Sequence, residues 1–317
     1  MNLLNRYALM TGLCFSVSCA YADEPQTCQA VRFADVGWTD IAATTALASV
    51  VFSGLDYKPQ KTSASVQIAM GGLKSKEVDV FLGYWRPALD AVAKPLIDAG
   101  DVHVVETPNL TGAKFTLAVP AYAYEGGLRT FADLHKYADK LNHKIYGIGS
   151  GGAGNLIIQK MIDQNQFELK NFNLIGSSEA GMLVEVNRAE RRNQWIVFLG
   201  WEPHPMNLKF DMRYLSGADD TFGPDYGAAT VYTMTRSDFT SRCPNAARLV
   251  SNLRFDTHME NQLMQAIMDN RQAPEKAATR WLQKNRSVLD TWLAGVNTLD
   301  GKPALPAMNA YLDKAAP

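Results

Sequence analysis

The chain has 317 residues, 47% of them hydrophobic and 20% charged, which is more than one hydrophobic core usually organises, so two lobes are expected. Its 31 Lys and Arg against 32 Asp and Glu leave a formal net charge of -1. No general field therefore attracts nucleic acid or an anionic membrane, and no nucleic-acid partner is expected. With 23 Gly, 14 Pro and no short repeat, the sequence excludes the disordered, collagenous and solenoid classes.

The first residues have the pattern of a secretory signal peptide. Arg6 lies in a short polar start, a mostly apolar run follows over 7–17, and Ala20-Tyr21-Ala22 ends it with small residues. Cleavage is expected after Ala22, so that 1–22 is the signal and the mature protein is exported. The apolar run is shorter than the stretch of about 18 residues that a membrane span needs, and no later segment approaches that length without charge.

The sequence contains four cysteines, of which Cys28 and Cys243 lie outside the signal. In an oxidising compartment an isolated pair tends to be joined, so we predict a disulfide between them. It closes a loop of roughly 200 residues, for which loop-closure entropy allows on the order of 5 kcal/mol of stabilisation. A lipid anchor at Cys14 or Cys19 is the alternative use of the signal, but neither residue follows a leucine-led pattern.

The predicted elements alternate between strands and helices, which indicates an α/β fold. Thr39 is the expected N-cap of the first helix, and Trp281 and Trp292 are predicted core residues at helical spacing. The strands are expected at 30–34, 62–68, 78–82, 115–119, 144–148, 195–199 and 229–235, and the helices at 40–52, from 70, at 155–163 and over most of the chain from 245.

The order of these elements predicts a bilobed fold, in which two α/β lobes are joined by two crossover strands. The first lobe is expected to contain 23–114, the second 115–227, and the chain returns to the first lobe over 228–317. The predicted disulfide agrees with this division, because it joins the first segment to the returning one. In open α/β sheets ligands bind where the strands end, so the strand ends are the expected site.

The string Gly149-Ser150-Gly151-Gly152-Ala153-Gly154 matches G-x-G-x-x-G between a strand and a helix. A dinucleotide site also needs an acidic residue at a strand end about 20 positions later, and Glu168 lies in a polar stretch instead. A glycine turn of this kind presents backbone N–H groups at a helix N-terminus, which suits a carboxylate or another anion. The alternative is a tight turn that touches no ligand.

No arrangement of residues nominates a catalytic or metal site. Ser150 is not in G-x-S-x-G, because Ile148 occupies the first glycine position. The 5 histidines are scattered without zinc-type spacing. We predict no catalytic residue, no metal and no cofactor, with an exported enzyme of unfamiliar type as the alternative. Two carboxylate pairs are interpreted as parts of solvated faces: Asp79 with Asp90, and Glu179 with Glu185.

Aromatic residues stand at the predicted strand ends, at Trp38, Trp85, Phe115 and Trp201. Rings from several loops can enclose a cation, and a quaternary ammonium suits such a box because it has permanent charge and apolar methyl groups. Four contacts of about 0.5 to 2 kcal/mol give about 2 to 8 kcal/mol, and a micromolar ligand needs about 8 kcal/mol. We predict an aromatic box for a quaternary ammonium compound; a core position for each single ring is the alternative.

Five strings make the sequence similar to the periplasmic choline and glycine betaine binding proteins of bacterial ABC importers. The resemblance extends over essentially the whole mature chain. It implies an α/β, bilobed periplasmic-binding-protein fold and a periplasmic location for the exported protein. The strings are VRFADVGWTD from Val31, DVFLGYW from Asp79, NLTGAKFTLAVP from Asn109, FLGWEPHPM from Phe198 and YLSGADD from Tyr214.

The resemblance implies that Trp38, Trp85 and Trp201 are walls of the box and that Asp40 lies near the ligand's hydroxyl and charge. It also implies the disulfide already predicted. Choline is the first choice of ligand, because the Asp40 carboxylate would repel an anionic tail beside it.

Two positions depart from the choline binders that the sequence resembles. The fourth wall, a tyrosine there, is Phe115 here, and an asparagine before the helix of the second lobe is replaced by Gly152. Gly151 and Gly152 could instead offer backbone N–H groups to a carboxylate, which would favour glycine betaine or carnitine.

The resemblance further implies the partners. The expected protein is a monomer that traps choline, glycine betaine or carnitine by hinge closure, without covalent chemistry, and delivers it to a membrane permease with a cytoplasmic ATPase. A receptor that only signals is the remaining alternative, since transport partners leave no pattern in this chain.

Overall fold

The computed structural model describes residues 24–149 and 152–315. The predicted signal peptide over 1–22 and the predicted site residue Gly151 lie outside these ranges. No helix in the described part of the chain combines the length and the apolar character that crossing a membrane requires.

Strands of the described residues form one sheet in the order β2-β1-β3-β10-β5-β8-β6-β7, with β4 added on β10 and β9 on β5. β1 pairs in parallel with β2 and β3, and β6 pairs in parallel with β7 and β8. The strands are β1 (Ala30–Asp35), β2 (Lys58–Ser63), β3 (Val80–Arg86), β4 (Val102–Val104), β5 (Leu110–Pro120), β6 (Lys144–Gly147), β7 (Asn173–Gly176), β8 (Phe198–Glu202), β9 (Met212–Tyr214) and β10 (Ala228–Arg236).

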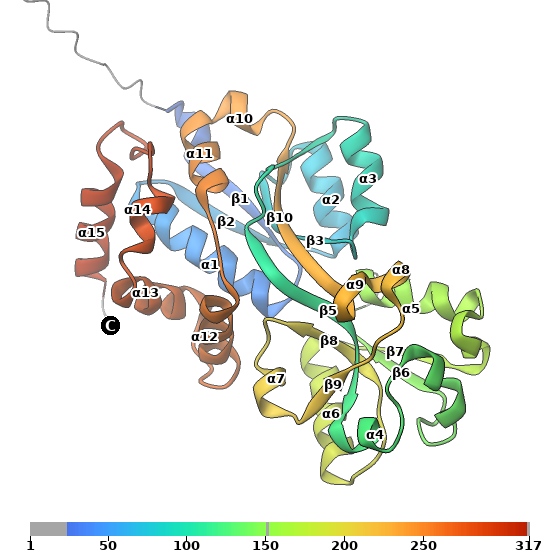
Figure 1. Ribbon diagram of the computed structural model, residues 1–317. Helices are drawn as coiled ribbons and strands as arrows, with labels where there is room; N and C mark the ends of the chain where they lie inside the picture. Colours follow the sequence, from blue (N-terminus) through green and yellow to red (C-terminus); the bar gives the residue numbers. More distant parts are fainter. Residues whose placement is uncertain (1–23, 150–151, 316–317) are drawn as a thin grey trace, which may run out of the picture.

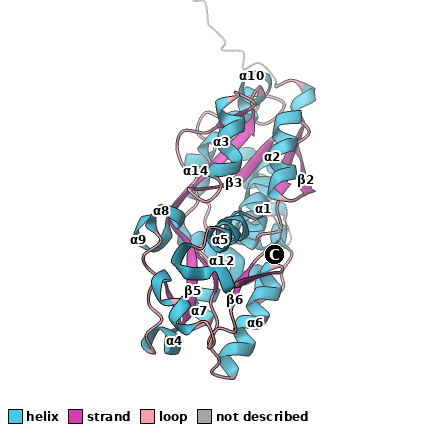
Figure 2. Cartoon of the chain, turned by 90° about the vertical axis from the view of Figure 1, so that its right-hand side faces the viewer, coloured by secondary structure: helices cyan, strands magenta, loops and turns pink. Residues whose placement is uncertain are grey.

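The helices cover the sheet and form two groups, with α2 and α3 in the upper part of Figures 1 and 2 and α4, α6 and α7 in the lower part. They are α1 (Thr39–Gly54), α2 (Val66–Ser75), α3 (Asp90–Asp98), α4 (Ala121–Glu125), α5 (Ala153–Asp163), α6 (Glu179–Arg191), α7 (Met206–Lys209), α8 (Asp219–Phe222), α9 (Pro224–Gly227), α10 (Phe239–Arg242), α11 (Pro244–Asn252), α12 (Thr257–Met268), α13 (Pro274–Lys284), α14 (Val288–Trp292) and α15 (Ala304–Lys314).

Two long antiparallel strands, β5 and β10, run side by side between these two parts of the molecule (Figure 1). We call the part with β1 to β3 lobe I and the part with β6 to β8 lobe II. The predicted fold class, two α/β lobes joined by two crossover strands, is confirmed. The lobe boundaries at 115 and 228 stay a prediction; the first falls inside β5 and the second at the first residue of β10.

Helix α1 holds lobe I together. It is buried along almost its whole length, because the sheet lies on one side of it while α12, α13 and α15 pack on another (Figure 1). This explains why apolar residues occur on every face of the helix and why its few polar side chains are small. The N-terminus of α1, which carries two of the predicted site residues, is therefore held by a rigid core.

The predicted disulfide is confirmed. Cys28 and Cys243 are bonded, with 5.6 Å between their Cα atoms, and both are buried. The bond joins the turn before β1 to the segment between α10 and α11. Of the two predicted core tryptophans, Trp292 is fully buried, whereas Trp281 is half-buried and packs at the edge of the core.

The second predicted strand, 62–68, is wrong beyond Ser63. There the chain leaves the edge strand β2, and the Ser65 side chain accepts a hydrogen bond from the Ile68 N–H and caps α2. Ile68 is 66% exposed, so this apolar residue does not belong to a strand that packs against the core. The side-chain cap competes successfully with strand propensity at this position.

The strands predicted at 78–82 and 195–199 end too early. β3 continues to Arg86 and β8 to Glu202, so Trp85 and Trp201 lie within strands and not in the loops after them. Gly83 does not terminate β3; a Cβ there would collide with the Ile41 side chain, so this glycine allows α1 to pack closely on the strand.

Candidate ligand-binding site

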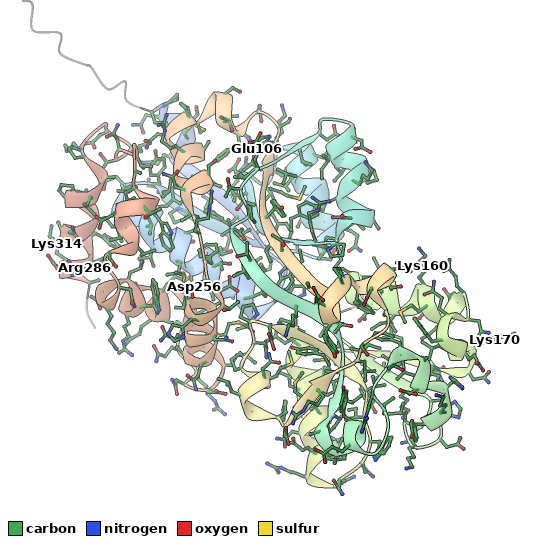
Figure 3. The ribbon with its side chains drawn as sticks, viewed as in Figure 1. Glu106, Lys160, Lys170, Asp256, Arg286 and Lys314 are labelled. Atoms are coloured by element: carbon green, nitrogen blue, oxygen red, sulfur yellow. A yellow bond between two sulfur atoms is a disulfide. The ribbon has the colours of Figure 1, made fainter. Side chains whose placement is uncertain are left out.

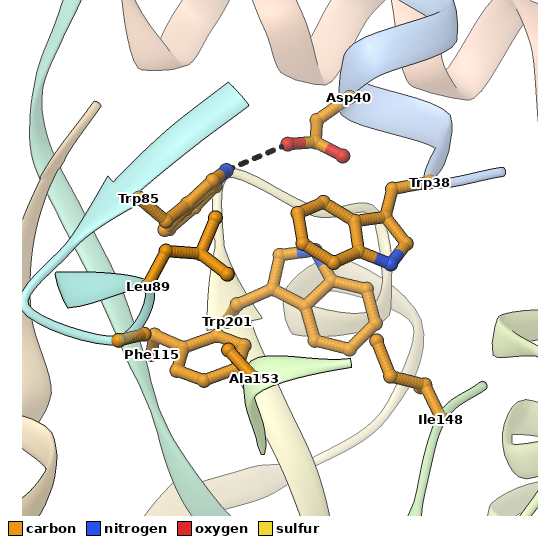
Figure 4. A pocket seen from close by; sticks show the side chains of 9 residues that line it. Trp38, Asp40, Trp85, Leu89, Phe115, Ile148, Ala153 and Trp201 are labelled. Carbon is orange, nitrogen blue, oxygen red and sulfur yellow. Dashed lines mark hydrogen bonds between the residues drawn. The ribbon is translucent and has the colours of Figure 1, made fainter. Parts of the chain in front are cut away.

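One pocket between the lobes collects most of the predicted site residues (Figure 4). Lobe I contributes Trp38 and Asp40 at the start of α1 and Trp85 near the end of β3, lobe II contributes Trp201 from β8, and Phe115 comes from the crossover strand β5. About 330 Å³ of the pocket, including space open to solvent, is not filled by protein atoms. Its other lining residues are Ala88, Leu89, Ile148 and Ala153.

The strand pairing explains why the rings meet. Phe115 and Trp201 are directly opposite each other on the antiparallel strands β5 and β8, so their side chains lie on the same face of the sheet. The Phe115 ring also lies 6.1 Å from the Trp85 ring, centroid to centroid, at 48°. Trp85 and Trp201 are buried, and Trp38 and Phe115 are half-buried. Rings from both lobes therefore line one enclosed space.

Close packing of α5 supports the Phe115 wall. A Cβ added at Gly154 would lie 2.5 Å from Leu199 Cδ2 and 3.0 Å from Phe115 Cζ. Only glycine lets the helix approach this closely. The last glycine of the G-x-G-x-x-G string thus has a packing explanation that needs no dinucleotide.

Asp40 contributes the negative charge of the pocket. It is 3% exposed, and its Oδ2 accepts a hydrogen bond of 3.0 Å from Trp85 Nε1 (Figure 4). Burial, followed by the nearby charge of Glu179, raises the pKa of Asp40 to about 7, although hydrogen bonds from the backbone and Trp85 act in the opposite direction. Glu260 on α12 is also buried near Asp40, and burial raises its pKa well above the ordinary value. A cation in the pocket would relieve this accumulation of acidic groups.

The glycine turn is less available to a ligand than predicted. Gly152 caps α5 and is absent from the pocket lining, and its N–H already donates to the Gly149 carbonyl at 3.0 Å. The described lining contains no Lys, Arg or His. Lys160 lines a neighbouring groove, and Figure 3 shows it with Lys170 at the outer edge of lobe II. An anionic tail therefore has no cationic partner among the described residues of the pocket.

Several residues around the pocket could not be found from the sequence. Ala88, Leu89, Ile148 and Ala153 are ordinary apolar residues, and nothing in their local pattern distinguishes them from core positions. Among residues 24–149 and 152–315, no group of three or more His, Cys, Asp or Glu side chains could hold a metal ion.

Three interpretations of polar residues are wrong. Thr39 is the first residue of α1 and not its N-cap, which is Trp38. Glu179 is not on a solvated face: it is 7% exposed and accepts hydrogen bonds from Thr39 and His204. Asp79 is also buried, in a salt bridge of 2.7 Å with Arg32. Burial of these carboxylates depends on partners remote in sequence, so a local pattern could not show it.

The fold and the enclosed pocket between two lobes are those of a substrate-binding protein of a transport system. The chain belongs to the family of substrate-binding domains of ABC-type glycine betaine transport systems, OpuAC, which matches residues 29–284. The family resemblance inferred from the five strings is thereby confirmed.

Solved structures and a curated relative agree with this assignment. An ABC-transporter choline binding protein in complex with choline is 47% identical, with a TM-score of 0.90 over 91% of this chain and 100% of that one. The unliganded semi-closed form gives 47% identity and a TM-score of 0.84, over 90% and 99% of the two chains. The glycine betaine/carnitine transport binding protein GbuC of Listeria monocytogenes is 28% identical over 163 residues, 51% of this chain and 53% of that protein.

Proposed function

We propose that this protein captures a quaternary ammonium compound, choline before glycine betaine or carnitine, in the pocket between its lobes. The observation that supports this most directly is the set of four rings from both lobes around a pocket whose charged lining residue is Asp40. Trp38, Trp85, Phe115 and Trp201 form the box, and Asp40 pairs with the cation.

The chemistry of this pocket fits a methylated cation. A quaternary ammonium has no N–H to donate, so the lack of hydrogen-bond acceptors on the rings does not penalise it, and its methyl groups bury apolar surface. The ring faces attract the cation by about 0.5 to 2 kcal/mol each. An ionised Asp40 adds a charge pair at low local dielectric. The same features disfavour a neutral sugar or a zwitterionic amino acid.

The tail of the ligand decides between choline and the two carboxylate-bearing compounds. A carboxylate near Asp40 would be repelled, and the described lining offers no cationic side chain to compensate. The Gly152 N–H, which could have served a carboxylate, is engaged by Gly149. The relative solved with choline, 47% identical to this chain, supports the same choice.

Two substitutions reduce the polar contacts available to a choline hydroxyl. Phe115 has no hydroxyl where choline binders have a tyrosine, and Gly152 has no amide where they have an asparagine. Recognition of the tail therefore depends more on Asp40 and on shape than it does in the proteins with both polar groups. We expect choline to bind, with weaker discrimination among neutral tails.

The proposed setting is the periplasm, after cleavage of the signal peptide following Ala22. There the monomer closes over its ligand and delivers it to a membrane permease with a cytoplasmic ATPase. The protein is not an enzyme in this proposal. Bound ligand recovered from the protein after prolonged incubation is expected to be chemically unchanged, and turnover products would instead support an exported enzyme.

Titration calorimetry tests the proposal. The mature protein, unfolded and refolded to remove any co-purified ligand, is titrated with choline, glycine betaine, carnitine and proline. Choline is expected to bind most tightly and proline not at all. Tighter binding of glycine betaine or carnitine than of choline would mean that the pocket selects a ligand with a carboxylate tail. If none of these three quaternary compounds binds, the box is not a quaternary ammonium site.

A further inference from the structure

Glu179, the first residue of α6 in lobe II, contacts the start of α1 in lobe I. Its Oε2 accepts a hydrogen bond of 3.0 Å from the Thr39 backbone N–H, and its Oε1 accepts one of 2.6 Å from Thr39 Oγ1. The two residues are 140 positions apart. The carboxylate therefore binds the N-terminus of a helix of the opposite lobe, both through a free backbone N–H and through a hydroxyl.

A second contact fixes Glu179 within its own lobe. His204 Nδ1 accepts a hydrogen bond from the Met206 N–H at 2.9 Å, so the proton of the neutral imidazole lies on Nε2, which donates to Glu179 Oε1 at 3.0 Å. Burial acts to raise the pKa of Glu179, but the hydrogen bond and electrostatic interaction with His204, followed by the hydrogen bonds from Thr39, outweigh it and lower that pKa. Glu179 is thus held as a carboxylate at the lobe interface.

The segments that hold Glu179 are also those that build the box. Thr39 stands between Trp38 and Asp40, and the His204 ring lies edge-on against the Trp201 ring at 4.8 Å. The contact can form only while these two segments face each other. A ligand that draws Trp38 and Trp201 together therefore also brings Thr39 to Glu179.

The charges link this contact to the sign of the ligand. Asp40 and Glu179 repel each other, and both are buried. In the empty pocket this repulsion opposes closure, whereas a cation beside Asp40 cancels it. A positively charged ligand therefore relieves a cost of closing that a neutral one leaves in place.

We propose that Glu179 is a positioning residue that latches the closed lobes through Thr39, so that it controls how long a cationic ligand stays bound without touching it. The coupling to ligand residence rests on the proposed function, but the latch between the lobes does not. The network around the other buried carboxylate that was misassigned, Asp79, joins Arg32 and Arg236 within lobe I, so it cannot report on closure.

The decisive variant is Thr39→Val, which removes the hydroxyl donor but leaves the charge of Glu179 in place. Stopped-flow tryptophan fluorescence of choline release is expected to show a dissociation rate about tenfold to a hundredfold faster, as for the loss of one hydrogen bond to a charged group. The association rate is expected to stay within about twofold, because the latch forms after the ligand enters. Thr39→Ser keeps the hydroxyl and is expected to retain the slow rate.

Two matched controls separate the latch from general effects. Thr45→Val makes the same change on the same helix, at a buried hydroxyl for which the structure shows no hydrogen-bond partner, and is expected to leave both rates unchanged. Glu185→Gln is the control for Glu179→Gln, since Glu185 pairs with Arg188 on its own helix. Melting temperatures without ligand verify that each variant folds.

The double variant Thr39→Val with Glu179→Gln completes the test. If the two residues act as one latch, the double variant releases choline no faster than Glu179→Gln does. Additive effects, or a Thr39→Val dissociation rate within twofold of the wild type, would overturn the latch. If the wild type binds no choline, the proposed function fails, and small-angle scattering of the ligand-free proteins then tests the latch by itself. A larger radius of gyration for the double variant than for the wild type would support the latch. Identical scattering curves would overturn it.

Discussion

The two walls of the pocket differ in what they can recognise. The lobe I wall has two rings and a buried carboxylate, Trp38, Trp85 and Asp40, whereas the described lobe II wall has one ring and aliphatic side chains, Trp201, Ile148 and Ala153. The first wall attracts a cation through a carboxylate and two rings, whereas the second attracts it through one ring only. We infer that lobe I captures the ligand and lobe II sets its residence time, through ring contact and through the Glu179 latch.

The charge of the lobe I wall is expected to have the largest effect. Asp40→Asn keeps an acceptor for Trp85 Nε1 but removes the negative charge, so choline binding should weaken by about 2 to 3 kcal/mol, the lower part of the range for breaking a buried charge pair. Calorimetry measures this loss. Asp98→Asn, in an exposed pair with Lys94 on α3, is the control and should bind as the wild type does. Equal choline affinities for the Asp40 variant and the wild type would mean that the charge of the lobe I wall does not attract the ligand.

The pH dependence follows from the same carboxylate. Burial, followed by the charge of Glu179, raises the pKa of Asp40 to about 7, and a bound cation lowers it again. The proton therefore competes with the cation: affinity is complete above about pH 7 and falls as the pH decreases through 7, by up to about tenfold per pH unit. Calorimetry at pH 8, 7 and 6 is expected to show this loss for choline. Asp40→Asn should bind choline equally weakly at all three pH values. If its affinity still depends on pH, the titrating group is a residue other than Asp40.

Trp201→Ala tests the lobe II wall. Loss of its ring should weaken choline binding by at least about 1 kcal/mol, with the change appearing mainly in the dissociation rate if lobe II acts as the cover. Circular dichroism and the melting temperature are expected to show an intact fold. Unchanged affinity would eliminate the box, and a change confined to the association rate would assign capture to lobe II.

Phe115→Tyr is expected to have the smallest effect. It tests the ring on the crossover strand β5, between the two walls of the pocket. The added hydroxyl should raise choline affinity by about 0.5 kcal/mol, as a single neutral hydrogen bond does, and leave tetramethylammonium affinity unchanged because that ion has no hydroxyl. Calorimetry with the two ligands gives the difference directly. Equal gains for both ligands would mean that the hydroxyl acts on the ring and not on the ligand tail.

The fold was largely predictable because its signals are local or covalent. Alternation of strand and helix patterns indicates the α/β class, and the two cysteines that lie after the predicted signal leave one intramolecular pairing. The predicted strand boundaries were wrong where one local sequence pattern is compatible with two structures. Ser65 capped a helix inside a predicted strand, and Gly83 served helix packing inside a strand predicted to end there.

The candidate site was predictable only in part. Trp38, Trp85, Phe115 and Trp201 could be selected because they stand at predicted strand ends and because the family resemblance implies their roles. Nothing in the sequence distinguishes Ile148 and Ala153 from residues of the hydrophobic core. Glu179 was misassigned to a solvated face, since its burial results from Thr39 and His204, which approach it only in the folded chain.

The amino-acid sequence by itself determined the disulfide partners and the α/β class, and it predicts an export signal and residue types suited to a methylated cation, since these follow from composition, spacing and local periodicity. The tertiary structure alone decided which side chains share the pocket, how strongly Asp40 is desolvated and which residues hold the lobes together. Burial and electrostatic coupling depend on distances between segments such as Thr39 and Glu179, 140 positions apart, and such distances exist only once the chain has folded.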